Sequence, residues 1–398
     1  MSKNNKIIYP LLENAFSKED LNCGIKVLKS KQITMSKKTI NFEKTFAKKN
    51  GSKYAIMTNS GSSANLLALS ALTNPLNKKR IKERSEVIIP AICWSTSLWP
   101  ILQNNLKPVF VDIDINTFNI SLIDLKKKIS SKTRAIMLIH VLGLSTNMDE
   151  LIKICKKKNI YLIEDTCESL GAKFKNKNLG TFGRFGTYSF YYSHQITSGE
   201  GGMVVCNNFD DYNLLKSLRS HGWSRGTIFE KKGKFKKFNF ITAGYNLRPT
   251  DIQAAIANNQ YKRLEKFKHQ RNQNRNLIIK SLRKSSKWSN QFSFTSYDEK
   301  KIKPSWFGLP ILLNKKLIKK KKIFLNYLDK VGIENRPILS GNFLNQPASR
   351  IYKFDNPRHY KFANEIENRG FFIGLHTKPI NKNTLNFLVK NLMKIDEI

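Results

Sequence analysis

Short apolar runs alternate with helix-like segments through the first half of the chain. Runs rich in Val, Ile and aromatic residues are predicted strands, namely Tyr54–Thr58, Glu86–Pro90, Pro108–Asp112, Ala135–His140, Tyr161–Glu164, Thr187–Tyr191 and Gly202–Cys206. Segments with apolar residues at helical spacing are predicted helices, namely Ser62–Leu72, Ser121–Ile129, Asp149–Lys157 and Asp210–Arg219. Apolar strands that alternate with helices predict an α/β fold with a mostly parallel sheet covered on both faces.

The pattern changes after Pro249. Residues Thr250–Lys284 read as one long helix, and the chain beyond Trp306 reads as a small α+β unit. A length of 398 residues is compatible with two or three domains. We therefore predict an N-terminal arm and large domain over residues 1–250. A long connecting helix and a smaller C-terminal domain are predicted over residues 251–398.

The composition is strongly basic, with Lys+Arg 70 against Asp+Glu 29, a formal charge of +41. Such a charge is typical of proteins that bind nucleic acid. The lysines are spread along the whole chain, however, in runs such as Lys78–Lys79, Lys126–Lys128, Lys156–Lys158 and Lys319–Lys322. This distribution indicates solvated helix faces rather than one binding patch. The run Gly233–Phe240, with aromatics between its lysines, is predicted to be an exposed loop, with a mobile basic flap over an anionic substrate as the alternative.

The cysteines and the apolar stretches bear on the compartment. Five scattered cysteines without CxxC spacing are typical of reduced thiols in the cytosol. The segment from Met1 to Phe16 lacks the apolar block of a signal peptide. No apolar stretch approaches the roughly 20 residues that span a bilayer. We therefore expect a cytoplasmic protein that does not bind membranes.

Three segments at predicted strand ends carry candidate chemistry, because an open α/β sheet binds its ligands at that edge. The small-residue turn Asn59–Asn65 precedes a helix, where free N–H groups can bind phosphate. Trp94 either covers a flat ring or belongs to the core. Asp165 either pairs with a cationic ring nitrogen or caps a helix, and Glu168 follows it closely. Buried carboxylates are costly unless they are paired.

A fourth segment, Gly186–His194, places hydroxyls and one histidine together, and the glycine turn Gly199–Gly202 follows it. A phosphate cup, a stacking aromatic, a carboxylate for a ring nitrogen and a strand-end hydroxyl are together the parts of a pyridoxal-phosphate site. The four segments therefore predict that cofactor in combination, although each alone is weak evidence.

With these motifs the chain resembles the DegT/DnrJ/EryC1/StrS sugar aminotransferase family of fold-type I pyridoxal-phosphate enzymes. The resemblance extends from Tyr9–Leu11 to Gly370–Gly374. It implies a large domain with a mixed, mostly parallel sheet between helices, and a smaller α+β C-terminal domain. One departure is important: in the motif SFxxxKxxxxGEGG the family usually has a lysine where this chain has His194. Imidazole cannot form the imine with the cofactor, but in its neutral form it can accept a proton near pH 7.

That departure resembles the 4-keto-6-deoxysugar 3-dehydratase branch of the family. One kind of these enzymes holds an iron–sulfur cluster with cysteines late in the chain, and here no cysteine follows Cys206. The chain is closer to the cluster-free kind that acts on GDP-4-keto-6-deoxy-D-mannose in colitose biosynthesis. The similar strings are His221–Arg225, Gly244–Pro249, Ser305–Gly308 and Arg336–Phe343. Gln195 stands where that kind has a second histidine.

The resemblance also implies roles for individual residues. Pyridoxamine phosphate, made from pyridoxal phosphate with glutamate as amino donor, would be the working cofactor, and no metal is implied. His194 would be the catalytic base. The cofactor contacts would be Gly61, Ser62 and Ser189 at the phosphate, Trp94 on the ring, Asp165 at the ring nitrogen, Glu168 at the polar edge and Asn246 from the other subunit of a homodimer. His221 and Arg225 are candidate substrate contacts, with a structural histidine and a surface charge as the alternatives. His140 and His376 are expected to be structural.

Two alternatives remain open from the sequence. The first is a nucleotide-sugar aminotransferase that works without the lysine, which is disfavoured because recycling of the cofactor needs an amine. The second is a catalytically inactive basic homologue that binds nucleic acid. The retention of Asp165, Ser189 and the phosphate cup argues against that second alternative.

Overall fold

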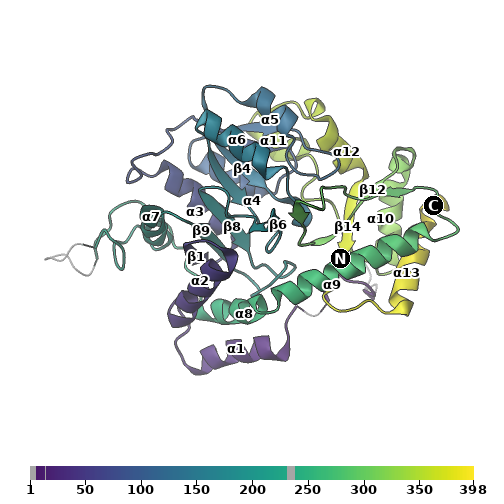
Figure 1. The fold of residues 1–398 in the computed structure, drawn as a ribbon, viewed down its shortest axis with the longest axis horizontal. Coiled ribbons are helices and arrows are strands. Elements are labelled where there is room, and N and C mark those ends of the chain that lie inside the picture. Colours follow the sequence, from purple (N-terminus) through teal and green to yellow (C-terminus); the bar gives the residue numbers. More distant parts are fainter. Residues whose placement is uncertain (1–5, 14, 231–237) are drawn as a thin grey trace.

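The computed structural model describes residues 6–13, 15–230 and 238–398 (Figure 1). Most of the basic run Gly233–Phe240 lies outside these residues. The larger helices are α1 (Lys18–Lys29), α2 (Lys37–Asn50), α3 (Gly61–Thr73), α4 (Ser95–Gln103), α5 (Leu122–Lys128), α6 (Met148–Lys158), α7 (Phe209–Arg219), α8 (Asp251–Tyr261), α9 (Leu264–Arg283), α10 (Lys321–Lys330), α11 (Pro347–Ile351), α12 (Lys361–Arg369) and α13 (Lys382–Leu392).

A seven-stranded sheet forms the centre of the large domain, in the order β1-β9-β8-β5-β4-β2-β3. Its strands are β1 (Tyr54–Thr58), β2 (Glu86–Pro90), β3 (Lys107–Val111), β4 (Thr133–Ile139), β5 (Tyr161–Asp165), β8 (Phe185–Ser189) and β9 (Gly202–Cys206). Strand β9 is antiparallel to both of its neighbours, whereas the pairs from β8 through β5, β4 and β2 to β3 are parallel. The predicted mostly parallel sheet is thus confirmed.

Successive side chains of each strand enter different apolar cores, because a strand has a period of two residues. In β4, Met137 and Ile139 face one core, and Ile136 and Leu138 face another. Helices α3, α4 and α7 cover the first face. Helices α5 and α6 cover the opposite face, and α2 and α8 continue that cover over β1 and β9. The sheet is therefore buried on both sides, as the apolar strand sequences predict.

The single long helix predicted over Thr250–Lys284 is wrong, because α8 ends at Tyr261 and α9 begins at Leu264. Helix α8 packs against α1 and α2, whereas α9 extends to α13 in the C-terminal domain (Figure 1). A turn between them lets each helix bury its own apolar face. The turn is held by Arg263, whose Nη2 donates a hydrogen bond to Asp20 Oδ2 of α1 at 2.5 Å.

The C-terminal domain is built on a second sheet in the order β10-β12-β14-β13. Its strands are β10 (Phe292–Ser293), β12 (Gly308–Leu313), β13 (Asn335–Arg336) and β14 (Gly370–Gly374), while β11 (Ile302–Lys303) pairs with the β6 (Lys173–Phe174) and β7 (Lys177–Asn178) hairpin. The N-terminal segment joins this domain: Tyr9 forms a parallel bridge with Ile333, and its hydroxyl donates to the Gly374 carbonyl at 3.0 Å. The domain division at residue 250 stays a prediction.

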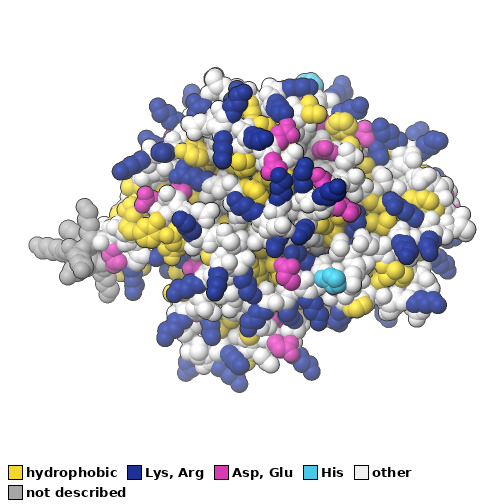
Figure 2. Space-filling view, viewed as in Figure 1, with side chains coloured by type: hydrophobic (Ala, Val, Ile, Leu, Met, Phe, Trp, Pro, Cys, Tyr) yellow, Lys and Arg dark blue, Asp and Glu magenta, His cyan; other side chains and the backbone are white. Residues whose placement is uncertain are grey.

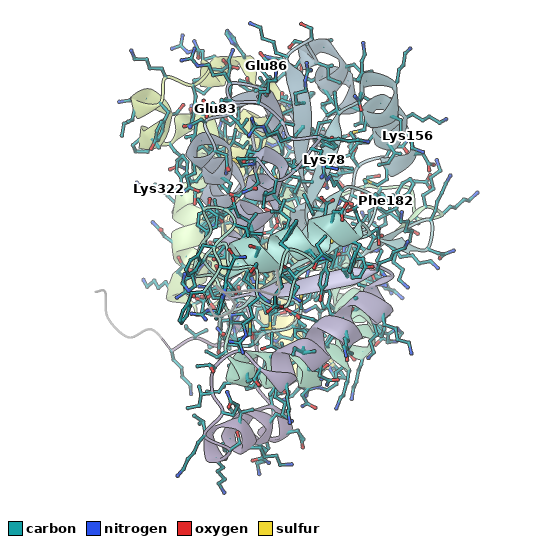
Figure 3. All side chains as sticks on the ribbon, turned by 90° about the vertical axis from the view of Figure 1, so that its left-hand side faces the viewer. Lys78, Glu83, Glu86, Lys156, Phe182 and Lys322 are labelled. Atoms are coloured by element: carbon teal, nitrogen blue, oxygen red, sulfur yellow. The ribbon has the colours of Figure 1, made fainter. Side chains whose placement is uncertain are left out.

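The basic side chains are scattered over the surface. Figure 2 shows Lys and Arg across the whole visible face, with acidic side chains between them. In Figure 3, the exposed Lys156 and Lys322 lie on opposite sides of the molecule. This distribution agrees with solvated helix faces. Among the described residues, the helices are all too short or too polar to cross a membrane.

Candidate active site

A cavity of about 500 Å³ lies at the carboxyl edge of the central sheet. The ends of β5 and β8 and the first turns of α3 and α4 form its floor, because parallel strands and the helices that follow them meet at one edge. The C-terminal domain supplies a wall that includes Phe307, Arg336 and Phe372. His194, the predicted base, lines this cavity. Most of the predicted cofactor contacts line it as well, namely Gly61, Ser62, Trp94, Asp165, Glu168 and Ser189.

The start of α3 forms a cup suited to an anion. Ser60 caps the helix by accepting a hydrogen bond from the Ser63 N–H at 3.1 Å. Gly61 approaches Ser189 so closely that an added Cβ would lie 2.5 Å from the Ser189 Cβ, so this position needs glycine. The Ser62 hydroxyl lies at the mouth of the cup, 3.0 Å from Thr96 Oγ1. Free N–H groups and hydroxyls in this arrangement fit a phosphate.

Trp94 is a cavity wall and not a core residue. Its side chain is 54% exposed, although a large aromatic at a strand end is normally buried. It occupies the N-cap position of α4, and its side chain makes no capping hydrogen bond. An exposed indole over the cavity fits the flat face of a bound ring.

Asp165 is a buried carboxylate that faces the cavity. Its Oδ2 accepts hydrogen bonds from Asn65 Nδ2 and Ser97 Oγ, both at 2.7 Å. Its Oδ1 accepts one bond, from the Cys167 N–H at 3.1 Å. A carboxylate has about four acceptor positions, so Oδ1 has capacity left for a donor in the cavity. Donors of this kind stabilise the negative charge.

Glu168 differs from Asp165 although both are carboxylic acids. Burial raises the pKa of Glu168 to about 8, and the nearby Asp165 charge adds to the effect. The Leu142 N–H, which donates to Glu168 Oε2 at 3.0 Å, opposes the rise in pKa without cancelling it. The Glu168 carboxyl therefore keeps its proton at neutral pH. The site holds one charged acceptor and one neutral acid that can donate.

His194 lies between two aromatic rings. Its ring meets Phe307 edge-on, with centroids 5.1 Å apart, and Tyr191 at 5.9 Å. Its Nδ1 is covered and has no hydrogen-bond partner, which leaves Nε2 for a ligand in the cavity. Burial lowers the pKa of His194 to about 3, and the positive charge of Arg271 contributes. The imidazole is therefore neutral and able to accept a proton.

No lysine is found among the described residues that line the cavity. The buried cation near His194 is Arg271, which is 2% exposed and donates from Nη1 to the Trp306 carbonyl at 3.2 Å. A guanidinium stays protonated and cannot form an imine. The cavity thus offers a base and hydrogen-bond donors but no amine.

Three predicted contacts do not reach the cavity of their own chain: Asn246, His221 and Arg225. All three are exposed. Asn246 Oδ1 accepts a hydrogen bond from Arg248 Nε at 3.1 Å, and the Arg225 guanidinium lies 5.2 Å from the Trp223 ring centroid. The His221 N–H donates to the Tyr245 carbonyl at 2.7 Å, and its backbone is left-handed. Their proposed roles remain predictions.

His140 and His376, which were expected to be structural, have partners within the fold. His140 Nε2 lies 3.0 Å from Glu164 Oε2, with both side chains fully buried. Glu164 also accepts the backbone N–H groups of Gly180, Phe182 and Gly183. His376 stacks on Tyr9 with ring centroids 4.2 Å apart. Neither histidine lines the cavity.

Sequence reasoning missed several residues at the cavity. Asn65 and Ser97 contact Asp165 from different helices. Asn65 ends the predicted phosphate-binding turn, but the sequence gives neither residue a role at Asp165. Arg336 and Phe307 also line the cavity. Both lie within sequence strings that carry the family resemblance, but the sequence did not indicate what either residue does. Gln195 is buried beside His194, and its Nε2 donates to the carbonyls of Glu168 and Ser305.

Within the described part of the chain, the acidic, histidine and cysteine side chains form no group able to hold a metal ion.

Comparison with known proteins identifies the family of this chain. The model of the DegT/DnrJ/EryC1/StrS aminotransferase family matches residues 14–388. GDP-4-keto-6-deoxy-D-mannose 3-dehydratase of Escherichia coli O55:H7 is 36% identical over 381 residues, which cover 93% of this chain and 96% of that protein. The match confirms the resemblance inferred from the sequence.

Solved structures show the same similarity. That of the E. coli GDP-4-keto-6-deoxy-D-mannose-3-dehydratase with bound hydrated PLP has a TM-score of 0.90 at 35% identity, and covers 97% of this chain and 99% of its own. A second, GDP-4-keto-6-deoxymannose-3-dehydratase with a trapped PLP-glutamate geminal diamine, has a TM-score of 0.89 at 35% identity over 96% and 100% of the two chains. The fold is that of the PLP-dependent aminotransferases, as predicted.

Proposed function

The chain belongs to the DegT/DnrJ/EryC1/StrS aminotransferase family, and on that basis we propose that it is a PLP-dependent 3-dehydratase of GDP-4-keto-6-deoxy-D-mannose. Glutamate is the amino donor. The observation that carries the proposal is a cavity of this fold in which a neutral imidazole, His194, takes the place of the amine. The relatives with this name support the choice of substrate.

The overall reaction replaces the C3 hydroxyl of the sugar by hydrogen. Glutamate is the reductant and becomes 2-oxoglutarate and ammonia. The C3 hydroxyl leaves as water and the new carbonyl oxygen of 2-oxoglutarate comes from water, so the atoms balance without another reductant. When bound, pyridoxamine phosphate supplies an amine for the C4 ketone and a protonated ring that accepts an electron pair.

The residues of the chain hold the cofactor and move one proton. Gly61, Ser62 and Ser189 would bind the phosphate at the start of α3, where free N–H groups favour an anion. Trp94 would cover one face of the ring. Asp165 would keep the ring nitrogen protonated through its partly free Oδ1. Glu168, which carries its own proton, would donate to the polar edge of the ring.

His194 would act as the base through Nε2, which would take a proton from the carbon that carries the cofactor's amine. Its low pKa keeps this nitrogen unprotonated at neutral pH. Because imidazole does not bond covalently to the cofactor, it stays available as a base. A lysine at this position would instead support amino transfer to the sugar. The side chain at position 194 therefore decides between the two reactions.

We further propose that a second copy of the chain completes the site. Asn246, His221 and Arg225 are exposed and lie outside their own cavity, as expected for residues that act on a partner's ligand. The side chains of Trp94, Tyr191 and Tyr192 are about half exposed near the cavity, which fits coverage by another subunit. In this arrangement Asn246 contacts the cofactor phosphate of the partner.

We also place the enzyme in the cytoplasm, where its five free cysteines would stay reduced.

Replacement of the base tests the proposal. His194→Asn should lower the dehydration rate by roughly 10²–10⁴-fold, the usual contribution of a general base. Binding of pyridoxal phosphate, followed by fluorescence quenching, should be retained. His359→Asn, at an exposed histidine outside the cavity, is the matched control and should leave the rate unchanged. Near-normal turnover of His194→Asn would refute the role of His194.

A further inference from the structure

The side chains of Asn65 and Thr187 are joined to Asp165 by consecutive hydrogen bonds. Asn65 lies on the second turn of α3, and its Nδ2 donates to Asp165 Oδ2 at 2.7 Å. On the other side of the amide, the Thr187 hydroxyl lies 2.5 Å from Asn65 Oδ1. Asn65 is 2% exposed and Thr187 is fully buried. The three side chains thus form one buried chain of hydrogen bonds.

The direction of these hydrogen bonds is fixed by chemistry. An ionised carboxylate only accepts, so the Asn65 atom that faces Asp165 must be the NH₂ group. Asn65 Oδ1 then faces Thr187, whose hydroxyl can donate. If the amide were turned over, its oxygen would face the carboxylate and its NH₂ group would face Thr187. The Asp165 carboxylate and the Thr96 carbonyl, which accepts from Asn65 Nδ2 at 3.3 Å, therefore select this orientation, and the Thr187 hydroxyl completes it by donating to Asn65 Oδ1.

The sheet places Thr187 for this task. Thr187 and Ser189 are two residues apart on β8, so their side chains point to the same face. That face is the one covered by α3, which carries both Gly61 and Asn65. One strand and one helix thus supply the phosphate cup and, two residues deeper, the support for Asp165.

From this arrangement we propose that Asn65 is a positioning residue for Asp165 and that the Thr187 hydroxyl helps to hold the Asn65 amide in place. The pair fixes Oδ2 so that Oδ1 stays directed at the ring nitrogen of the cofactor. The inference rests on the proposed function, since it assumes that pyridoxal phosphate binds in this cavity. Ser97 also donates to Oδ2, at 2.7 Å, so loss of Asn65 would loosen the carboxylate without leaving it unpaired.

The test measures cofactor binding instead of turnover. Asn65→Ala should weaken pyridoxal phosphate binding by about tenfold, the size expected for one charge-assisted hydrogen bond. Thr187→Val, which keeps the shape but removes the hydroxyl, should weaken binding in the same direction. Thr187→Ser keeps a donor and should bind within about twofold of wild type. Thr73→Val removes a hydroxyl two turns further along α3, outside the cavity, and is the control.

Two further readouts separate positioning from a general loss of structure. In Asn65→Ala, the protonated ring nitrogen should lose its proton at lower pH, seen as a shifted pH titration of the bound cofactor's absorbance. The double variant Asn65→Ala/Thr187→Val should bind no more than about twofold weaker than Asn65→Ala, because Thr187 acts through Asn65. If Asn65→Ala does not fold, the Thr187→Val and Thr187→Ser pair decides the matter.

The outcomes are distinct. If Asn65→Ala or Thr187→Val leaves both the affinity for pyridoxal phosphate and the pH titration of the bound cofactor unchanged, the positioning role is overturned. Binding of pyridoxal phosphate by the wild-type chain would in that case still support the proposed function. Additive losses in the double variant would also overturn it. Failure of the wild-type chain to bind pyridoxal phosphate would instead reject the proposed function on which the inference rests.

Discussion

The ring of Phe307 meets the ring of His194 edge-on, with centroids 5.1 Å apart and an interplanar angle of 80°. His194 follows β8 of the large domain, whereas Phe307 precedes β12 of the C-terminal sheet. Phe307 in turn packs edge-on against Phe372, with centroids 5.7 Å apart. Because Nδ1 of His194 has no hydrogen-bond partner, aromatic packing is what orients the imidazole. The C-terminal domain therefore sets the direction of the proposed base.

Truncation of that ring is expected to impair catalysis more than cofactor binding. Phe307→Ala should lower kcat by roughly 10- to 100-fold, because a base displaced by about 1 Å loses that much rate. The dissociation constant of pyridoxal phosphate should change little. Steady-state kinetics and cofactor titration provide the two values. Phe294→Ala, a partly buried aromatic of the same domain outside the cavity, is the control; equal losses in both variants would contradict the orienting role.

The raised pKa of Glu168 predicts a dependence on pH. Below about pH 8 the carboxyl is protonated and can donate; above it the proton is lost and the donor becomes an acceptor. The value of kcat/KM should therefore fall as the pH rises through about 8. Glu168→Gln keeps a donor at every pH and should lack this alkaline decline. A decline that persists unchanged in Glu168→Gln would assign it to another group.

The same shift in pKa predicts a change of stability. In the unfolded chain Glu168 titrates near its ordinary value of 4.5, whereas in the folded chain it holds its proton to about pH 8. Between these two pH values the folded state binds more protons than the unfolded state. The contribution of Glu168 to the free energy of unfolding therefore decreases as the pH rises. Denaturation of the cofactor-free protein at pH 5 and pH 8 should show a smaller decrease for Glu168→Gln than for wild type. An equal decrease would mean that Glu168 is not shifted.

Gln195 links two loops beneath the base. Its Nε2 donates to the carbonyl of Glu168 and, at 3.1 Å, to that of Ser305. Gln195→Ala leaves both buried carbonyls without this donor and should lower the free energy of unfolding by about 1–3 kcal/mol. Urea denaturation measures the loss. The exposed Gln103→Ala should stay within about 0.5 kcal/mol of wild type, and a similar small effect at Gln195 would show that the link is dispensable.

Shared active sites can be tested by complementation. If Asn246 binds the cofactor of a partner subunit, then Asn246→Ala and His194→Asn affect different sites of one mixed dimer. One site then carries both defects and the other carries neither. Mixing two inactive variants under conditions that exchange subunits should restore up to about a quarter of wild-type activity, since half of the dimers are mixed and each has one intact site. No recovery, with exchange verified by mass, would contradict the shared site.

Much of the fold follows from local sequence. Tyr54–Thr58, Glu86–Pro90 and Gly202–Cys206 are strands with the predicted bounds, because each is a short apolar run between turns. The strand predicted at Thr187–Tyr191 instead spans Phe185–Ser189. Its hydrogen bonds to β5 and β9 fix those bounds, and such partners are distant in sequence.

The candidate site was predictable only where a residue lies in a motif at a strand end. Gly61, Asp165, Ser189 and His194 fall in this class. Asn65 lies in such a motif too, but its contact with Asp165 was not predictable, because the two residues are 100 positions apart in the sequence. The break between α8 and α9 likewise depends on Arg263 and Asp20, which only tertiary packing brings together.

Product analysis tests the central claim most directly. The protein should be incubated with pyridoxal phosphate, glutamate and GDP-4-keto-6-deoxymannose, and the sugar products and ammonia measured by mass spectrometry and enzymatic assay. The account predicts a 3-deoxy-4-keto sugar and ammonia in equal amounts, because His194 supplies a base but no amine. A 4-amino sugar with no release of ammonia would contradict it and identify an aminotransferase.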